Sequence, residues 1–249
     1  MSTNEAVIRF EEVSKSFGSK RILQDVSFDI ARGSAFCILG RSGTGKSVTL
    51  KLMIGLLKPE QGKIFVEGQE ITALHARELP PVRKTMGFLF QNAALFDSLS
   101  VGENVAFPLR RHTNKPEADI RDRAREKLAQ VGLEHEYDIM PADLSGGMRK
   151  RAGLARALAL NPSILLVDEP SAGLDPLTSA EIDSLLLNLK SERDTTLVVV
   201  THNIPSARRI GDELVVMHEG HFIAHGTAKE LDQSDHPVVR EFMKSEGGG

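Results

Sequence analysis

The eight residues 40–47 constrain the fold of this chain more than any other stretch. They read Gly-Arg-Ser-Gly-Thr-Gly-Lys-Ser and match the pattern of a phosphate-binding loop: Gly, four residues, Gly-Lys, then Ser or Thr. A continuous apolar run, residues 34–39, precedes them, and apolar residues with helical spacing follow over residues 46–57. This strand-loop-helix order is the context that the pattern requires, so we predict a site for a polyphosphate ligand.

The residue types in the loop suit phosphate binding. Glycines allow the sharp turn in which successive backbone N–H groups converge on phosphate oxygens, and the helix N-terminus adds partial positive charge. We expect the Lys46 ammonium to reach the outer phosphates and the Ser47 hydroxyl to help hold a magnesium ion. The predicted ligand contacts in this stretch are Gly40, Arg41, Ser42, Gly43, Thr44, Gly45, Lys46, Ser47 and Val48.

Two further apolar runs end in polar residues that suit the same site. Residues 163–167 are followed by Asp168 and Glu169, and the run 195–201 is followed by His202. In an open parallel sheet, ligands bind at the carboxyl ends of the strands. Because neighbouring residues of a strand point to opposite faces, we expect Asp168 to face magnesium and Glu169 to face an attacking water.

A glutamine and a phenylalanine complete the candidate site near the strands. The apolar run 86–90 ends at Gln91, whose side-chain oxygen could bind magnesium or position water. Two stretches within residues 7–30 alternate apolar and polar side chains and predict antiparallel strands around a turn at residues 18–19. Phe17 lies at the tip of this ribbon, where its ring could stack on a nucleotide base or make an ordinary hydrophobic contact.

A second glycine pair stands at the start of a predicted helix. Ser145 is placed as its N-cap, before Gly146 and Gly147 and an apolar face that includes Leu154 and Leu158. Two glycines in a first turn weaken a helix, so they favour a role in which another group approaches the backbone closely. The capping serine and the bare N–H groups predict a second anion site.

The stretch between the two glycine motifs predicts a helical region. Residues 100–130 have mostly helical character, with a polar break at 111–116. The alternating charges of residues 117–131 predict a solvated helix face, and no catalytic group is visible there.

Composition excludes several classes of protein. The formal net charge of the 249 residues is only −3, which disfavours non-specific nucleic-acid binding. The single cysteine, Cys37, excludes an internal disulfide and favours a reducing compartment. No apolar stretch approaches the roughly 18 residues needed to span a bilayer, so we expect a cytoplasmic chain that reaches a membrane only through a partner.

These motifs together resemble those of ATP-binding cassette (ABC) transporter ATPases. The resemblance covers nearly the whole chain and rests on matching order and spacing. The stretches that carry it are 40–47, Gln91, 144–148, 164–169, 171–175 and His202.

The resemblance implies a role for each matching position, with ATP and Mg²⁺ as the bound groups. Lys46 and Ser47 resemble the Walker A contacts, Gln91 resembles the Q-loop glutamine, and residues 145–147 resemble the signature sequence. Ser47 and Gln91 would also be magnesium ligands.

The remaining matches lie in the second half of the chain, apart from Phe17. Asp168 and Glu169 resemble the Walker B magnesium acid and the catalytic base, Asp175 the D-loop acid, and His202 the switch histidine. Phe17 occupies the position where the family usually has a tyrosine that stacks on the base.

The family fold that the resemblance implies is α/β. It has a P-loop NTPase core with a mainly parallel sheet, an N-terminal antiparallel β subdomain and a helical subdomain inserted at about residues 92–160. We expect one domain over residues 1–246 and a flexible glycine tail at 247–249. The family's mode of action implies a homodimer in which each ATP contacts the Walker A loop of one chain and the signature of the other.

The residues around the signature resemble a particular subfamily. Met148 stands where most members have glutamine, and residues 90–101 and 104–109 also resemble the ATPases of Mla-type, Mce-associated phospholipid transport systems. This match implies a separate membrane permease, an Mce-domain protein, a small STAS-type regulatory subunit and a position on the cytoplasmic face of the inner membrane. By the same resemblance, Phe96 and Leu99 line a groove for a permease helix, although they could equally belong to the core of the lobe.

A polar-solute importer remains as an alternative, and two non-transport classes are disfavoured. One of these, a ribosome-acting cassette protein, normally carries two such domains in one chain. An importer of a polar solute would share the catalytic motifs and differ mainly around Met148 and residues 91–109. A chromosome-maintenance or repair ATPase would need a long coiled-coil insertion between the phosphate loop and the signature, and no heptad array of that kind is present there.

Overall fold

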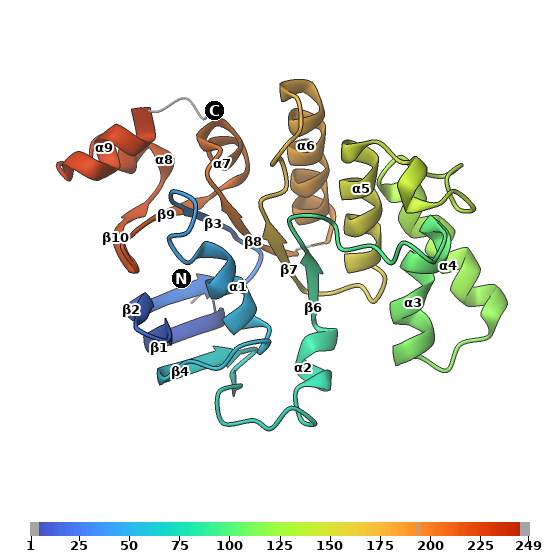
Figure 1. Cartoon of the computed structure of the whole chain (residues 1–249), viewed down its shortest axis with the longest axis horizontal. Helices are drawn as coiled ribbons and strands as arrows, with labels where there is room; N and C mark the ends of the chain where they lie inside the picture. The colour runs from blue at the N-terminus through green and yellow to red at the C-terminus, as the bar shows by residue number, and fades with distance from the viewer. Residues whose placement is uncertain (1–4, 194, 245–249) are drawn as a thin grey trace.

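The computed structural model of the chain describes residues 5–193 and 195–244, so the expected glycine tail at 247–249 lies outside the described residues. The N-terminal strands form an antiparallel sheet in the order β2-β1-β4-β5 (Figure 1). Its strands are β1 (Ala6–Phe17), β2 (Lys20–Ala31), β4 (Gln61–Val66) and β5 (Gln69–Glu70). The antiparallel ribbon expected around residues 18–19 is therefore confirmed.

A second sheet of six strands has the order β10-β9-β3-β8-β7-β6. All neighbouring pairs are parallel except β9 with β10. Its strands are β3 (Ala35–Leu39), β6 (Met86–Leu89), β7 (Ile164–Asp168), β8 (Thr196–Thr201), β9 (Glu213–His218) and β10 (His221–Gly226). The parallel arrangement brings the carboxyl ends of β3, β6, β7 and β8 to one edge, as the sequence predicted for the candidate site.

Helices cover both faces of this sheet, and three of them pack against one another as a helical lobe that shares its core with the sheet. In Figure 1, α3, α4 and α5 lie at the opposite end of the molecule from the antiparallel sheet. The helices are α1 (Lys46–Met53), α2 (Pro80–Lys84), α3 (Val101–His112), α4 (Glu117–Gln130), α5 (Gly146–Ala157), α6 (Pro176–Arg193), α7 (Ile204–Ile210), α8 (Ala228–Asp232), α9 (Pro237–Lys244) and the 3₁₀ helix η1 (Pro141–Asp143). In the described part of the chain, no helix is both long and apolar enough to cross a membrane.

The parallel sheet lies between two apolar layers. Residues of β3 alternate between them, because successive side chains of a strand point to opposite faces. Ala35, Cys37 and Leu39 pack in the layer that includes the helical lobe, and Phe36 and Ile38 pack in the layer that includes α1 and the antiparallel sheet. Both faces of β3 are buried, which explains its continuous apolar sequence.

Cys37 is a packing residue, as its place in an apolar run predicted. Its side chain is fully buried. Burial, with the negative charges of Asp212 and Asp183, raises the pKa of the thiol from 9.0 to about 12. The thiol is therefore protonated at physiological pH and is a poor nucleophile.

The helix after the phosphate loop is shorter than the apolar spacing predicted. It ends at Met53 instead of near residue 57. Gly55 follows with a φ of 68°, a left-handed conformation that commonly ends helices. The Leu79 side chain packs against this glycine, because a Cβ there would lie 3.1 Å from Leu79 Cδ1.

Helix α4 has the solvated face that its alternating charges predict, and its other face is buried. Helix α4 buries Ile120, Ala124 and Leu128, so it packs on the lobe through an apolar stripe. Lys127 on the same helix is also fully buried, with 0% of its surface exposed. Its ammonium donates to Asn161 Oδ1 at 2.7 Å, which compensates part of the cost of burying the charge.

Candidate functional site

The phosphate loop joins β3 to α1 and turns sharply through its glycines. Gly43 and Gly45 have φ values of 80° and 111°, which side chains with a Cβ rarely adopt. At Gly40 the constraint is space, because a Cβ would lie 2.7 Å from the Met217 carbonyl oxygen. Thr44 Oγ1 donates to the Arg41 carbonyl oxygen at 2.9 Å and closes the loop. These contacts hold the backbone in a compact turn at the N-terminus of α1, a geometry that suits anions.

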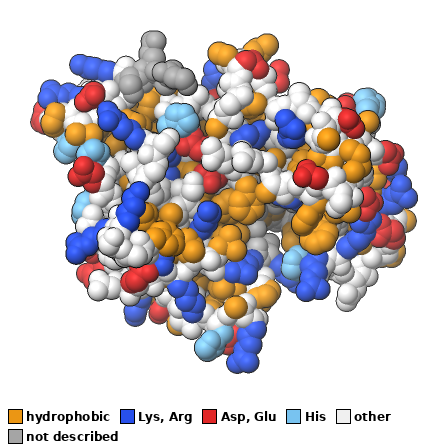
Figure 2. All heavy atoms as spheres, viewed as in Figure 1, with side chains coloured by type: hydrophobic (Ala, Val, Ile, Leu, Met, Phe, Trp, Pro, Cys, Tyr) orange, Lys and Arg blue, Asp and Glu red, His pale blue; other side chains and the backbone are white. Residues whose placement is uncertain are grey.

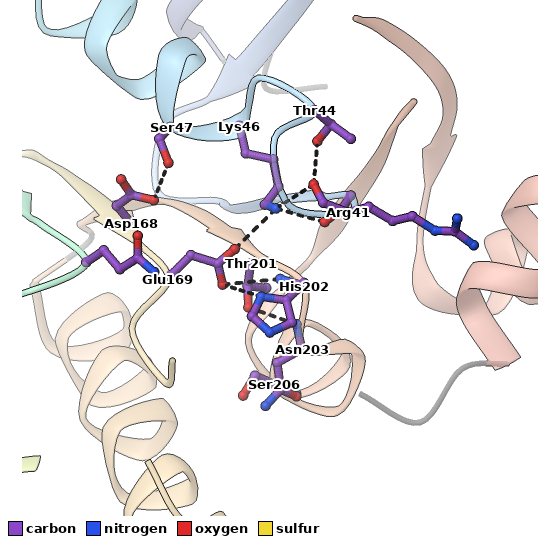
Figure 3. A network of polar contacts seen from close by, with 12 residues as sticks. Arg41, Thr44, Lys46, Ser47, Asp168, Glu169, Thr201, His202, Asn203 and Ser206 are labelled. Carbon is purple, nitrogen blue, oxygen red and sulfur yellow. Dashed lines mark hydrogen bonds and ion pairs between the residues drawn. The ribbon is translucent and has the colours of Figure 1, made fainter. Parts of the chain in front are cut away.

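Lys46 and Glu169 form a buried ion pair at the centre of the site (Figure 3). Lys46 Nζ lies 3.2 Å from Glu169 Oε1 and donates to the carbonyl oxygens of Gly40 and Arg41 at 2.8 and 3.2 Å. His202 Nδ1 lies 2.9 Å from the other carboxylate oxygen, Oε2. The Glu169 carboxylate is thus held between a lysine and a histidine that come from different strand ends.

Ser47 and Asp168 form a second contact beside this pair. Ser47 Oγ donates to Asp168 Oδ1 at 2.8 Å. Burial raises the pKa of Asp168, and the hydrogen bond from Ser47 opposes that shift. A hydroxyl and a carboxylate are oxygen donors of the kind that Mg²⁺ prefers, so these two residues fit a magnesium ion.

Glu169 has an unusual backbone conformation. Strand β7 ends at Asp168, and Glu169 follows with a φ of 47°. The sequence argument assumed that Glu169 continues the strand and points to the face opposite Asp168. Because Glu169 lies beyond the strand and has a left-handed backbone, strand alternation does not set the direction of its side chain. The two acids still differ in their partners, because Asp168 contacts Ser47 whereas Glu169 contacts Lys46 and His202.

The start of α5 is capped as predicted. Ser145 has an extended backbone, and its Oγ accepts a hydrogen bond from the Met148 N–H at 3.2 Å. Gly147 also has an internal reason to be glycine, because a Cβ there would lie 2.5 Å from Thr178 Cγ2 of α6. At Gly146 the nearest atom to a Cβ is Leu174 Cδ2, at 3.4 Å, which is ordinary contact.

This difference predicts opposite effects of two alanine substitutions. Gly147→Ala should destabilise the chain by about 1–3 kcal/mol, because the added methyl overpacks against Thr178. Gly146→Ala should be neutral or stabilising by at most about 1 kcal/mol, because alanine favours the helix. Denaturant unfolding of the two variants and the wild type measures both values. Equal stability of the two variants would contradict the packing argument.

Gln91 and Asp175 lie outside the contacts that link the central residues. The Gln91 side chain is exposed at the end of β6. Asp175 begins α6: its Oδ1 accepts from the backbone N–H groups of Leu177 and Thr178, each at 3.0 Å. The Thr178 side chain also donates to it, and these hydrogen bonds lower the pKa of Asp175. The predicted nucleotide roles of Gln91 and Asp175 remain predictions.

The other predicted contacts lie around the rim of the loop. Phe17 ends β1 with 49% of its surface exposed, and Lys15 Nζ lies 5.2 Å from its ring centroid. Arg41 is exposed, and its Nη2 lies 3.5 Å from Glu241 Oε1 of α9. Val48 packs partly buried on the core around α1. Stacking by Phe17 therefore also remains a prediction.

Two basic residues of α5 were missed by the sequence analysis. Lys150 donates to backbone carbonyl oxygens of Gln91 and Glu169, and Arg156 donates to carbonyl oxygens of the segment after Gln91. A signal for Lys150 was present, because it lies four residues before Leu154 and so falls on the apolar face of its helix.

Comparison with known protein families agrees with this geometry. A family model described as ABC transporter matches residues 23–172. The probable ribonucleotide transport ATP-binding protein mkl of Mycobacterium leprae is 48% identical over 236 residues, covering 95% of this chain and 68% of the relative. The chain thus spans about two thirds of the length of the mycobacterial relatives it matches.

A second relative and a solved structure match over nearly their whole lengths. The intermembrane phospholipid transport system ATP-binding protein MlaF of Haemophilus influenzae is 41% identical, covering 99% of this chain and 93% of the relative. The dimeric post-hydrolysis structure of the ATP-binding cassette MJ0796, bound to ADP and Pi, has a TM-score of 0.83 at 34% identity, covering 88% of this chain and 98% of that one. With the phosphate loop and the Lys46–Glu169–His202 cluster, these matches establish that the chain belongs to the ABC transporter family and is one of its ATPase subunits.

Proposed function

We propose that this ATPase powers phospholipid transport through a separate membrane permease, in a system of the Mla type. The single observation that supports hydrolysis at this site is the Glu169 carboxylate, held by Lys46 at 3.2 Å and His202 at 2.9 Å beside a phosphate-binding turn. The phospholipid assignment is supported by the 41% identity to a protein named for intermembrane phospholipid transport, over 93% of that protein.

Each residue of the central cluster has a part in hydrolysis. Lys46 and the loop N–H groups bind the outer phosphates and stabilise the charge that develops on them. Glu169 orients the attacking water and accepts its proton, while His202 contacts the γ-phosphate and holds the Glu169 carboxylate in place. Ser47, Asp168 and Gln91 would hold Mg²⁺, which screens the phosphate charge when bound.

The active unit is a homodimer with two shared sites. The capped N-terminus of α5, at residues 145–147, is a candidate anion site. Among the described residues, no hydrogen bond joins it to Lys46 of the same chain, whose partners are the carbonyl oxygens of Gly40 and Arg41. In a two-fold dimer, the signature of one chain faces the phosphate loop of the other, and Asp175 and Phe17 lie near the shared nucleotide. ATP bound between the chains would then hold the dimer closed until hydrolysis.

An apolar patch on the helical lobe is a candidate permease contact. Phe96 and Phe107 are each 45% exposed, and their ring centroids lie 5.0 Å apart. Buried Asn104 fixes this segment, because its side chain bonds both the N–H and the carbonyl oxygen of Phe96. On the face drawn in Figure 2, hydrophobic side chains also gather across the middle of the molecule, in the region where Figure 1 places β6 and β7, with charged residues around them.

The proposed system includes further partners. We propose that the chain sits on the cytoplasmic face of the inner membrane, bound to its permease. An Mce-domain protein and a small STAS-type regulatory subunit would complete the assembly, and nucleic acid is not a partner. The relatives named for intermembrane phospholipid transport support the type of system. The individual partners and the location are proposed from the resemblance of Met148 and of residues 90–101 and 104–109 to the ATPases of such systems.

A second candidate is transport of a polar solute. It is favoured by the mycobacterial relatives, which are named for probable ribonucleotide transport and share 48% identity with this chain. Both candidates use the same ATPase chemistry and differ only in the permease that the chain serves.

Purification from native membranes distinguishes the two candidates. The chain is isolated in mild detergent, and co-purifying proteins and lipids are identified by mass spectrometry. Recovery of a multi-span permease with an Mce-domain protein and phospholipid is the expected result. A permease with a solute-binding protein would support the second candidate, and recovery of ribosomes or DNA would contradict a transport role. Phe96→Ser is a useful companion variant, because loss of the permease from that sample would locate the contact.

A further inference from the structure

Lys150 occupies a buried position inside the first turns of α5. Only 6% of its surface is exposed, although the lysine carries a charge. Its Nζ donates to the Glu169 carbonyl oxygen at 2.9 Å and to the Gln91 carbonyl oxygen. A buried ammonium is expensive unless its donors are satisfied, and here two backbone carbonyls accept from it.

The two carbonyls belong to the ends of neighbouring strands. Gln91 follows β6 and Glu169 follows β7, and these strands pair in parallel. Lys150 therefore links α5, whose N-terminus is the signature, to the ends of two strands of the nucleotide site. One side chain joins three segments that are far apart in the sequence.

The contact is important for Glu169 because the backbone there is strained. A φ of 47° is uncommon for a residue with a Cβ, and such conformations persist only where the surroundings hold them. The Glu169 N–H donates to the Val200 carbonyl oxygen at 2.9 Å. The Glu169 carbonyl oxygen accepts from Lys150 Nζ at 2.9 Å and from the Ala172 N–H at 3.3 Å. Removing Lys150 therefore releases the shorter of the two hydrogen bonds to this carbonyl and loosens the peptide after Glu169, which the longer bond alone then holds.

Helix α5 also holds the segment after Gln91. Ala93 and Ala94 have φ values of 57° and 51°, and Arg156 donates to both of their carbonyl oxygens. Gly153 allows a close approach of the helix, because a Cβ there would lie 2.9 Å from Ala93 Cβ. The helix that begins with the signature is thus fastened at several points to the segment that follows β6.

The charge of Lys150 faces the acids of the site. Burial lowers the pKa of Lys150, and the negative charges of Asp168 and Glu169 oppose that shift. The ammonium therefore supports both the backbone position of Glu169 and the negative charge nearby.

We propose that Lys150 is a positioning residue for ATP hydrolysis, which fixes the Glu169 backbone and couples the signature helix to the ends of β6 and β7. It acts through Glu169 and does not itself contact the reacting atoms. The inference rests on the proposed role of Glu169 as the base.

The test replaces Lys150 by methionine, which keeps most of the volume and removes the donors. ATP hydrolysis and ATP affinity are measured on the purified chain. The expected result is a fall in kcat of about 10- to 100-fold, since a small misplacement of a catalytic group costs rate. KM for ATP should change by less than about twofold, because the loop and Lys46 are untouched. Lys150→Arg should restore at least part of kcat, because a guanidinium can donate to both carbonyls.

Lys127→Met is the matched control. It also removes a buried lysine from the helical lobe, where Lys127 donates to Asn161 and Gln130. Lys127→Met should lower the free energy of unfolding. At a temperature where the variant is folded, its kcat should stay close to that of the wild type. Lys150→Leu, which also lacks donors, is assayed in parallel, and thermal unfolding confirms that each variant is folded at the assay temperature.

A double mutant shows whether Lys150 works through Glu169. In a Glu169→Gln background, Lys150→Met should lower the residual rate by less than about twofold, because the group it positions is already lost. An unchanged kcat in folded Lys150→Met or Lys150→Leu would overturn the inference. The inference would also be overturned if Lys150→Met lowered the residual rate of the Glu169→Gln variant by the same factor as it lowers the wild-type rate. A wild-type chain whose rate is insensitive to Glu169→Gln would instead contradict the proposed base, so the two failures are distinguishable.

Discussion

Replacing Glu169 by glutamine is expected to lower the rate of ATP hydrolysis by about 10²- to 10⁴-fold, the usual contribution of a general base. ATP binding should be retained. The amide has the same shape as the carboxylate but cannot accept a proton from water. Lys46 keeps its hydrogen bonds to the carbonyl oxygens of Gly40 and Arg41, so the phosphate loop should stay in place.

The variant should also accumulate as an ATP-bound dimer. Hydrolysis is the step expected to open the dimer, so its loss leaves the chains held together by ATP. Phosphate release measures the rate, and size-exclusion chromatography with ATP, compared with ADP, measures the dimer. We expect a dimer peak only with ATP.

Glu213→Gln provides a matched control for this experiment. Glu213 pairs with His225 at 2.8 Å, so the substitution also breaks a glutamate-histidine contact, but on β9 and β10, away from the loop. It should leave the rate within about twofold of the wild type, as expected of a surface change. A Glu169→Gln rate equal to that of this control would show that Glu169 is not the base.

The part of the site that could be predicted from the sequence lies at strand ends. Asp168 and His202 each come at the end of a continuous apolar run, and Lys46 follows a third such run after the phosphate loop. A parallel sheet brings the ends of such runs together. The order of residues along the chain therefore predicts their meeting in space. The same rule explains why Glu169 meets both Lys46 and His202. It does not predict the left-handed backbone of Glu169.

The part that could not be predicted consists of side chains that bond to backbone. The helical spacing from Leu154 indicates that Lys150 lies on the buried side of its helix, but neither this spacing nor the position of Arg156 indicates which groups the two side chains contact. Their acceptors are carbonyl oxygens of distant loops, and every residue has a carbonyl, so no residue type marks the partner. The burial of Lys127 was also not predicted. In a helix of alternating charges, nothing in the sequence distinguishes the lysine that is buried against Asn161 from charged residues that face solvent.

Two inactive variants should recover activity when they are mixed, if each site is shared between chains. Lys46→Ala removes the cation of the phosphate loop. Gly146→Asp places a negative charge at the N-terminus of α5, where it suits the helix but repels a phosphate. A side chain fits at this position, because the nearest atom to a Cβ is 3.4 Å away. Each variant alone should therefore fold and be inactive.

In a mixed dimer, both changes fall in one site and the other site is intact. Half of the dimers in an equal mixture contain both variants, and one of their two sites works, so about a quarter of the wild-type rate is expected for independent sites. Mixing either variant with the wild type distinguishes the alternatives. If the two shared sites must act together, the mixture of the two variants shows no recovery. The mixture of one variant with the wild type then has about a quarter of the wild-type rate, because only wild-type dimers are active. The shared arrangement is contradicted if the two variants show no recovery when mixed and either variant mixed with the wild type has half the wild-type rate. In that case a single chain supplies both the loop and the signature to its own ATP.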